Sequence, residues 1–426
     1  MTFIPYKILS HIVSPIVASA LMFSGKKAAK SQRLGYLPQK IKQDAPFDLW
    51  MHGVSVGEIG VVKAIYDEFK IVNQDSKIIV SSFTDTGVER AGDLFKNIPV
   101  IYYPVDIPWA VKRSVLSIRP KIYCVVETEL WPNLLFYLKK QKTKLILLNG
   151  RLSPTSFNRY KKISFFIKEV LELFDQLCVI SVKDKERFIS LGAKEEKISI
   201  CGNAKFESLL KAPSIRRQKD IQKRLPLISK RPIIVAGSVR GKEYVEVISA
   251  LFLLKKSGLN PILILVPRHL ERINEIERFL REKGLLYKLF SKIDKDYNLG
   301  EVDCILIDKI GILFDLYSLC DFAFVGGTLI SKGGQNLMEP ASWQRPVVFG
   351  PYFYNFQDAG ELLLERGGGF LVKSMEELYE AFKMLLEKRD LRVKAGINAR
   401  KALEELGRGA ANNQARILHH FLRNSF

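Results

Sequence analysis

Short apolar runs alternate with amphipathic segments along most of the chain. In the first half, the apolar runs predict strands at 47–52, 77–82, 99–103, 121–126, 144–148, 176–180 and 197–201. Segments with apolar residues at helical spacing lie between them, for example at 58–70, 109–118 and 134–140. Strands that alternate with helices in this way indicate an α/β fold with a mostly parallel, doubly wound sheet.

The alternation breaks once, at 207–230, a stretch rich in Lys and Arg that also holds Pro213 and Pro226. This composition is typical of an interdomain linker. Strands are predicted again at 231–237, 261–267, 302–307, 322–326 and 346–349, and helices from about 374 to the end. We therefore expect two Rossmann-like domains, 44–206 and 231–426, the second closed by C-terminal helices. Such sheets bind ligands beyond the carboxyl ends of their strands, so facing domains would share a central cleft.

The N-terminal residues 1–43 form a separate segment. Residues 3–23 are largely apolar, although Pro5, Lys7, His11 and Pro15 interrupt them, and residues 25–43 carry six basic side chains and no acid. An apolar helix followed by a basic tract is a two-part signal for an anionic cytoplasmic leaflet. We expect a membrane-associating helix at the cytoplasmic face of the inner membrane, either spanning the bilayer or lying on it. The alternative is a core helix followed by a basic loop.

The net charge of +21 favours anionic partners, which include nucleic acid, anionic lipid and phosphorylated substrates. Charge alone does not choose among them. The five cysteines form no CxxC pair and lie in or beside apolar runs, so they indicate buried thiols in a reducing compartment.

Two glycine pairs carry the clearest chemical signal. The apolar run at 322–326 enters Gly326-Gly327, and Gly333-Gly334 then opens a predicted helix whose first turn holds Asn336 and Glu339. Glycines let a phosphate approach the chain, and N–H groups at a helix start hold an anion. A Glu one turn later can accept hydrogen bonds from a sugar diol. We therefore expect a nucleotide-sugar donor site in the second half and the acceptor chemistry in the first.

Polar clusters also follow six predicted strands. In the first half, 52–60 contains Glu58, 126–133 contains Glu127 and Glu129, 149–153 contains Arg151, and 201–207 contains Lys205; in the second half, 236–243 contains Ser238 and Arg240, and 266–272 contains Arg268. A Glu at a helix start is often only a partner of the helix dipole, which is the structural alternative for Glu58. Two acids beside a buried strand end are costly unless they are paired or used, and the arginines are suited to phosphate.

The order of these motifs resembles that of a known family, the bacterial 3-deoxy-D-manno-octulosonic acid (Kdo) transferases of lipopolysaccharide synthesis. The similarity covers nearly the whole chain and rests on residues 55–58, 84–89, 103–108, 127–133, 149–153, 202–206, 267–271, 324–328, 333–339, 349–351 and 355–356. The resemblance implies a GT-B fold and an inverting transfer of Kdo from CMP-Kdo to the lipid A precursor, lipid IVA. No metal and no cofactor are expected, because no DxD-type acidic pair lies in the donor half.

Roles for individual residues follow from the resemblance. Glu58 would be the general base, and Glu127 and Lys205 would stabilise the transition state. The CMP contacts would be Pro267, Arg268, Ile310, Gly311, Ile312, Asn336, Leu337, Met338 and Glu339. Further candidates for acceptor or phosphate contacts are Ser55, Gly57, Arg151, Ser238 and Arg240.

The chain departs from the family pattern at three places. Ile312 replaces a family Glu, Ser238-Val239-Arg240 replaces Ser-Thr-His, and Gln335 replaces a His. Only backbone contact survives at Ile312, and Arg240 offers positive charge where the family has the His. The base and the acidic pair are intact, so we expect activity with altered donor handling.

Three alternatives stay open at this point. Another GT-B transferase would share the fold and the Gly-Gly helix start but lack the pairing of 127–133 with 55–58. A sugar-nucleotide epimerase would share the cleft, and dependence on CMP distinguishes it. A nucleic-acid-binding protein would explain the charge, but the basic residues are spread widely and no nucleic-acid motif occurs. No residue decides how many Kdo units are added or the oligomeric state.

Overall fold

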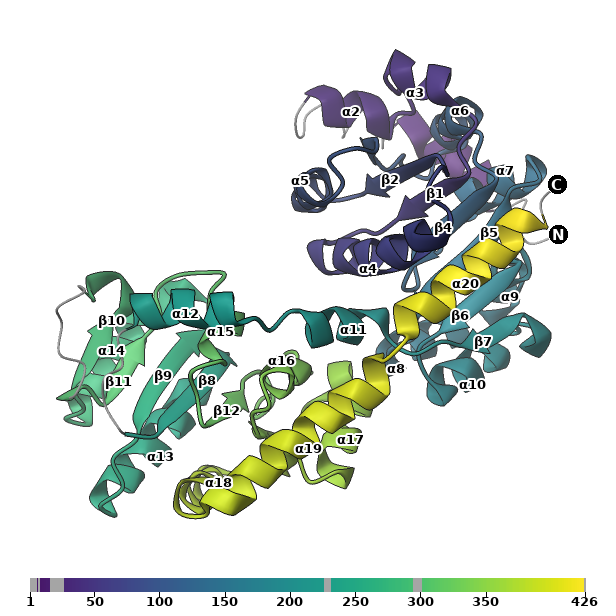
Figure 1. The fold of residues 1–426 in the computed structure, drawn as a ribbon. Coiled ribbons are helices and arrows are strands. Elements are labelled where there is room, and N and C mark those ends of the chain that lie inside the picture. The colour runs from purple at the N-terminus through teal and green to yellow at the C-terminus, as the bar shows by residue number, and fades with distance from the viewer. Residues whose placement is uncertain (1–5, 7, 16–26, 226–230, 294–300, 425–426) are drawn as a thin grey trace. The chain divides into compact units, whose positions relative to one another are not determined.

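The computed structural model describes residues 6, 8–15, 27–225, 231–293 and 301–424 (Figure 1). Its strands form two parallel sheets of seven strands each. The contacts divide the chain into unit 1, Met1–Ser208 with Gly407–Phe426, and unit 2, Leu209–Leu406. Each unit is built around one sheet, as expected for two doubly wound domains.

Unit 1 has the strand order β3-β2-β1-β4-β5-β6-β7. The chain therefore winds outward from β1 and returns to its other side at β4, which places a topological switch point between these two strands. The central strands are wholly buried because helices cover both faces of the sheet. The strands are β1 (Leu49–His52), β2 (Ile78–Ser82), β3 (Val100–Tyr102), β4 (Ile122–Val126), β5 (Lys144–Gly150), β6 (Gln176–Val179) and β7 (Ile198–Ile200).

Successive side chains of each strand enter two separate cores, as the two-residue period of a strand requires. Trp50 packs with α6, α7 and α9 on one face, whereas Met51 packs with α4 and α5 on the other. The helices and the 3₁₀ turn of unit 1 are α2 (Lys27–Arg33), α3 (Gln39–Asp44), α4 (Val56–Val72), α5 (Asp85–Leu94), α6 (Pro108–Ile118), α7 (Pro132–Lys140), α8 (Pro154–Lys161), α9 (Ser164–Glu172), α10 (Val182–Ser190), η1 (Glu195–Lys197) and α20 (Ala410–Arg423). Helix α11 (Ala204–Lys211) contains the boundary with unit 2.

Helix α20 belongs to unit 1, although the sequence places it in a C-terminal domain of residues 231–426 (Figure 1). Its buried Leu418 and Leu422 share a core with α4. Gln414 Oε1 accepts a hydrogen bond of 2.7 Å from Asn149 N, and Glu207 Oε2 accepts one of 2.7 Å from Ala411 N. These contacts join residues more than 200 positions apart, so no local pattern predicts them.

The stretch 207–230, predicted as a linker, is structured over much of its described length. Helix α12 (Ile215–Arg224) buries Ile221, and Leu225 follows it into the same core, which includes Val235 and Ile262 of unit 2. The high Lys and Arg content reflects the exposed face of an amphipathic helix. Residues 226–230 lie outside the described residues.

Unit 2 has the strand order β10-β11-β9-β8-β12-β13-β14, with its switch point between β8 and β12. Strands β10 and β14 were not predicted from the sequence; they are the edge strands and only three residues long. Their side chains are half-buried or exposed, so they lack a strong apolar signal. The strands are β8 (Ile233–Val239), β9 (Ile262–Pro267), β10 (Tyr287–Leu289), β11 (Cys304–Leu306), β12 (Phe322–Val325), β13 (Val347–Phe349) and β14 (Gly369–Leu371).

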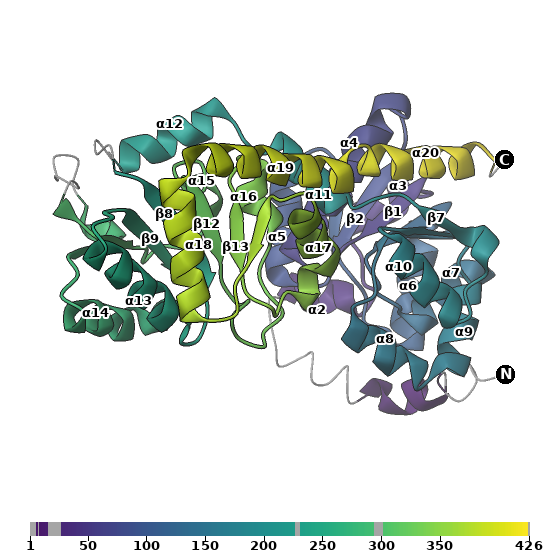
Figure 2. The same ribbon diagram turned by 90° about the horizontal axis from the view of Figure 1, so that it is seen from below.

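Helices cover both faces of this second sheet as well. Figure 2 shows α12 and α13 on opposite sides of β8 and β9, and the two hydrophobic cores agree with this arrangement. Ser374 caps α18 by accepting a hydrogen bond from Glu377 N, as its capping-box pattern predicts. The further helices and 3₁₀ turns are α13 (Glu243–Lys256), η2 (Leu270–Arg272), α14 (Ile273–Glu282), η3 (Phe290–Lys292), α15 (Leu313–Leu316), α16 (Met338–Ser342), η5 (Tyr354–Phe356), α17 (Gln357–Glu365), α18 (Met375–Glu387) and α19 (Arg389–Gly407).

Most of the apolar N-terminal segment predicted at 3–23 lies outside the described residues. Residues 8–15 are helical. Among the residues that the structure describes, no helix combines the length and apolar character needed to cross a membrane.

Candidate active site

The loop after β1 holds the carboxylate of Glu58 in a fixed position. Glu58 Oε2 accepts a hydrogen bond of 2.7 Å from Val54 N, and Oε1 accepts one of 2.9 Å from Ser55 Oγ. Ser55 caps α4 by accepting a bond from Glu58 N in return. A Cβ on Gly53 would lie 3.1 Å from Glu58 Cβ, so glycine permits this close approach. Glu58 is thus part of a reciprocal helix cap, which fixes the direction of its carboxylate.

The same carboxylate has an unusual affinity for a proton. The pKa of Glu58 is raised to about 7, mainly by burial and also by the negative charges of Glu127 and Glu129. The hydrogen bonds from Val54 and Ser55 oppose this rise by stabilising the charged form. A carboxylate with a pKa near neutrality is well matched to general-base catalysis.

The loop after β4, across the switch point, presents the two acids predicted there. Glu127 has a left-handed backbone with φ of 60°, which is uncommon for a residue other than glycine. Its N–H nevertheless donates a hydrogen bond of 2.9 Å to Leu148 O, so the neighbouring strand supports this conformation. Burial raises the pKa of Glu129, and the charge of Glu127 adds to that rise. A left-handed backbone at a residue other than glycine, as at Glu127, is concentrated at functional sites.

Lys205 joins this group from the start of α11. Its Nζ lies 4.0 Å from the position that a Cβ on Gly57 would take, and Ser55 Oγ lies 3.9 Å from the same point. Asn149 Oδ1 accepts a bond of 2.9 Å from Ala204 N and so ties the start of α11 to the end of β5. The structure therefore brings together four residues that the sequence singles out, namely Ser55, Gly57, Glu58 and Lys205.

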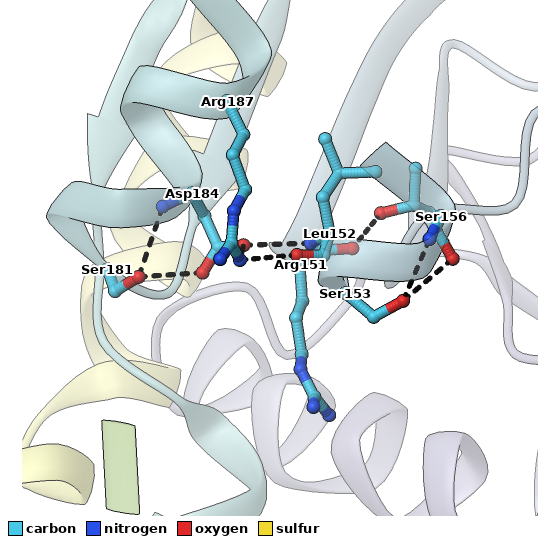
Figure 3. A network of polar contacts seen from close by, with 8 residues as sticks. Arg151, Leu152, Ser153, Ser156, Ser181, Asp184 and Arg187 are labelled. Atoms are coloured by element: carbon cyan, nitrogen blue, oxygen red, sulfur yellow. Dashed lines mark hydrogen bonds and ion pairs between the residues drawn. The ribbon is translucent and has the colours of Figure 1, made fainter. Parts of the chain in front are cut away.

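The loop that carries Arg151 is fixed mainly through its backbone (Figure 3). Asp184 Oδ1 accepts a hydrogen bond of 2.8 Å from Leu152 N, and Arg187 Nη1 donates one of 2.6 Å to Leu152 O. Thr128 Oγ1 donates to Arg151 O, which links this loop to the acidic loop after β4. Figure 3 shows the Arg151 guanidinium extending away from Asp184.

In unit 2, the first glycine turn, residues 326–329 after β12, is occupied by a side chain of the protein itself. The carboxylate of Glu243, the first residue of α13, accepts hydrogen bonds from Gly327 N at 2.6 Å and from Thr328 N at 2.9 Å. Leu329 N and Arg240 N donate to it as well, both at 2.8 Å. The sequence gives no signal for this role of Glu243, because three of its four partners, Gly327, Thr328 and Leu329, lie more than 80 residues away.

The second glycine turn follows directly. Gly333 and Gly334 have φ of 83° and 79°, a conformation that favours glycine. Asn336 donates to Glu339 Oε1 at 3.3 Å and accepts from Met338 N at 3.2 Å, so these two predicted donor contacts form one polar pair. Leu337 and Met338 are buried, and their side chains therefore belong to the core rather than to a ligand surface.

Two arginines lie at the carboxyl ends of β8 and β9. Arg268 N donates to Val239 O at 2.9 Å, so its loop lies against the Ser238–Arg240 turn. Arg240 Cδ lies 3.7 Å from the position that a Cβ on Gly327 would take. Neither guanidinium has an ion pair or a hydrogen bond within the described parts of the chain. Both are therefore available to an anionic ligand.

The remaining residues predicted to contact the donor lie at the end of β9 and just before α15. Pro267 is the buried last residue of β9. Ile310 is 81% exposed and Gly311 has φ of 89°, whereas Ile312 is buried in the core at the start of α15. The Ile312 side chain thus faces away from solvent. Among the described residues, no three His, Cys, Asp or Glu side chains lie close enough to hold a metal ion.

Two Rossmann-like units, one with carboxylates after β1 and β4 and the other with glycine turns after β12, define a two-domain α/β protein of the GT-B type. Solved structures agree on the fold: a glycosyltransferase from Rickettsia africae is 14% identical, with a TM-score of 0.62 over 89% of this chain and 99% of that one. UDP-GlcNAc 2-epimerase from Neisseria meningitidis is 15% identical, with a TM-score of 0.60 over 88% of this chain and 99% of that one. At such identities the likeness shows the fold alone.

Sequence comparison identifies the family. Residues 28–208 match the family model described as 3-deoxy-D-manno-octulosonic-acid transferase (kdotransferase). The 3-deoxy-D-manno-octulosonic acid transferase of Haemophilus influenzae is 30% identical over 88% of both chains, and that of Aquifex aeolicus is 32% identical over 84% of this chain and 92% of that protein. The chain belongs to this glycosyltransferase family. A bifunctional glycosyltransferase/methyltransferase of Fusobacterium nucleatum is 39% identical over 79% of this chain, which spans about half of that longer protein (52%).

Proposed function

We propose that the protein transfers Kdo from CMP-Kdo to the lipid A precursor, lipid IVA, with inversion at the sugar and with Glu58 as the general base. The observation that carries the proposal is the state of Glu58, whose carboxylate is held by Val54 and Ser55 and whose pKa is raised to about 7. Family membership supports the donor and the sugar.

In this mechanism, the unprotonated Glu58 accepts the proton of the acceptor hydroxyl as the oxygen attacks the anomeric carbon of Kdo. The bond from that carbon to the CMP phosphate breaks, and the phosphate oxygen keeps the electron pair. Arg240 and Arg268, which have no protein anion among the described residues, would stabilise the charge on the departing phosphate. Lys205, whose Nζ lies near Gly57, would pair with the Kdo carboxylate.

We also propose that the protein acts at an anionic membrane surface. The helix at residues 8–15 exposes Ile8, Leu9, Ile12 and Val13. It is anchored by Tyr6, whose hydroxyl donates to Asp106 at 2.9 Å and whose ring lies 5.4 Å from that of Phe166. The neighbouring segment 159–168 exposes Ile163 and Phe165 and carries the exposed basic residues Arg159, Lys161, Lys162 and Lys168. Apolar side chains among basic ones are suited to an anionic lipid surface.

A product mass spectrum tests the transfer reaction. The purified protein in detergent is given tetraacylated lipid A precursor and CMP-Kdo generated in situ. The wild type should add mass in Kdo units, and the mass also counts the sugars. Glu58→Gln keeps the size of the side chain but removes the base, and it should lose about 10²–10⁴-fold in rate.

The matched control is Asp67→Asn, an exposed position on the same helix, α4. It should retain wild-type activity. A folded wild-type protein that adds no Kdo would refute the proposed function, and full activity in Glu58→Gln would refute the assignment of the base.

A further inference from the structure

The turn that follows β12 has the form of an anion site that is already filled. Four backbone N–H groups converge on the Glu243 carboxylate: Gly327 at 2.6 Å and Arg240 at 2.8 Å reach Oε2, and Thr328 at 2.9 Å and Leu329 at 2.8 Å reach Oε1. Loops bind phosphate through backbone N–H groups that converge on one point, commonly after a glycine. Here the side chain of residue 243 stands where a phosphate oxygen would otherwise lie.

The contacts also indicate the charge state of this side chain. Glu243 is only 1% exposed, and no cation pairs with it in the parts of the chain that the structure describes. Burial raises the pKa of its carboxyl, and the four N–H bonds oppose that rise. All four neighbours are donors, so a protonated oxygen would find no acceptor among them. The N–H groups therefore stabilise the ionised form, as charge-assisted hydrogen bonds do.

The carboxylate connects the two sides of the switch point in unit 2. Arg240 follows β8, whereas residues 327–329 follow β12, and these strands are neighbours in the sheet. Gly334 N donates to Gly327 O at 2.8 Å, so the second glycine turn is attached to the first. Arg240 Cδ lies beside Gly327. The positions of Arg240 and of the second glycine turn thus depend on Glu243.

We propose that Glu243 is a positioning residue for the donor: its carboxylate occupies the first glycine turn in place of a phosphate, and it holds Arg240 and the second glycine turn where they receive the donor's own phosphate. A donor with one phosphate needs one phosphate site, which leaves the first turn free for this structural use. The inference rests on the proposed function for the identity of the donor, and it adds a residue that does not touch the donor.

Calorimetric titration of the full-length protein with CMP tests this role, together with steady-state rates at varied CMP-Kdo. Glu243→Gln keeps the shape of the side chain but turns an NH₂ group toward two N–H donors, so the contacts at one oxygen are lost. We expect the Kd for CMP and the KM for CMP-Kdo to rise about tenfold, equivalent to about 1.4 kcal/mol, while kcat at saturating donor stays within about threefold. Glu246→Gln, one turn later on α13, is the matched control and should stay near wild type.

A purely structural role gives a different result. In that case Glu243→Gln would lower the thermal midpoint but leave the Kd for CMP unchanged well below that midpoint, and this outcome would overturn the proposal. A loss of kcat with an unchanged KM would overturn it too. If the Gln variant does not fold, Glu243→Asp keeps the charge but is too short to reach all four N–H groups, and the same rise in Kd is expected.

The two proposals fail separately. A wild-type protein that binds CMP but transfers no Kdo refutes the proposed function, and the CMP affinities of the variants still decide the role of Glu243. A folded wild type that does not bind CMP refutes both.

Discussion

Replacing Glu127 with Gln should move the acidic limb of the pH–rate profile to lower pH. Glu58 must be unprotonated to act as a base, so the rate falls as pH drops through its pKa, which is raised to about 7. The charge of Glu127 is the second largest cause of this rise, after burial. Because the variant removes a negative charge, the ionised form of Glu58 becomes easier to make and its pKa falls.

The size of the effect follows from the titration curve. With a pKa of about 7, roughly one tenth of Glu58 is unprotonated at pH 6. If the variant lowers that pKa by about one unit, which corresponds to about 1.4 kcal/mol, roughly half is unprotonated at the same pH. The rate at pH 6, relative to each enzyme's own plateau, should therefore rise about fivefold.

The assay is kcat/KM for the acceptor between pH 5 and 9, with each profile normalised to its plateau. Normalisation matters because the family resemblance also gives Glu127 a part in stabilising the transition state, so the plateau itself should fall. Glu129→Gln should shift the limb less, since the charge of Glu129 raises the pKa of Glu58 less than that of Glu127 does. A limb that stays in place or moves to higher pH in Glu127→Gln would show that the two carboxylates do not interact as described.

Three further predictions concern the membrane surface, the glycine turns and the last helix. Phe165→Glu should reduce co-sedimentation with anionic vesicles about tenfold, whereas Val393→Glu, exposed on α19, should not; equal binding by both would refute the proposed surface. Gly334→Ala should lower the free energy of unfolding by about 1–2 kcal/mol because the backbone of Gly334 has a positive φ. Gly60→Ala should raise it by about 0.4–1 kcal/mol, because Gly60 lies within α4 and an added Cβ would meet no atom within 4 Å. Thermal unfolding measures both changes, and a change of the same sign in both variants would refute the prediction. Leu418→Ala should cost about 2–5 kcal/mol and speed hydrogen exchange in α20, and a near-neutral result in chemical unfolding would mean that α20 does not share the core of unit 1.

The central strands and the first half of the site were predictable from local sequence. The runs that became β1, β4 and β9 are apolar because helices cover both faces of each sheet. Ser55 caps α4 through Glu58 N, three residues later, and a cap at this spacing is visible in the sequence. Short edge strands such as β14 escaped, since their side chains are only partly buried.

The tertiary structure decided what depends on partners far apart in the chain. Burial together with the charges of Glu127 and Glu129 raises the pKa of Glu58, and Lys205 approaches the neighbouring Gly57 from α11. The sequence marks each of these residues singly, whereas their combination needs the strand order that places β1 beside β4.

At the glycine turns, local sequence and tertiary structure each determine a separate feature. By itself the sequence determined that strands end in glycine turns suited to anions, because backbone freedom is a local property. Which anion fills the first turn was decided by topology: β8 and β12 are neighbours, so α13 begins beside the turn and Glu243 enters it. For the same reason α20 joins unit 1, since its apolar face matches α4 across more than 300 residues of sequence. Local propensity and capping act over a few residues, whereas packing and long-range hydrogen bonds are defined only once the sheets have formed.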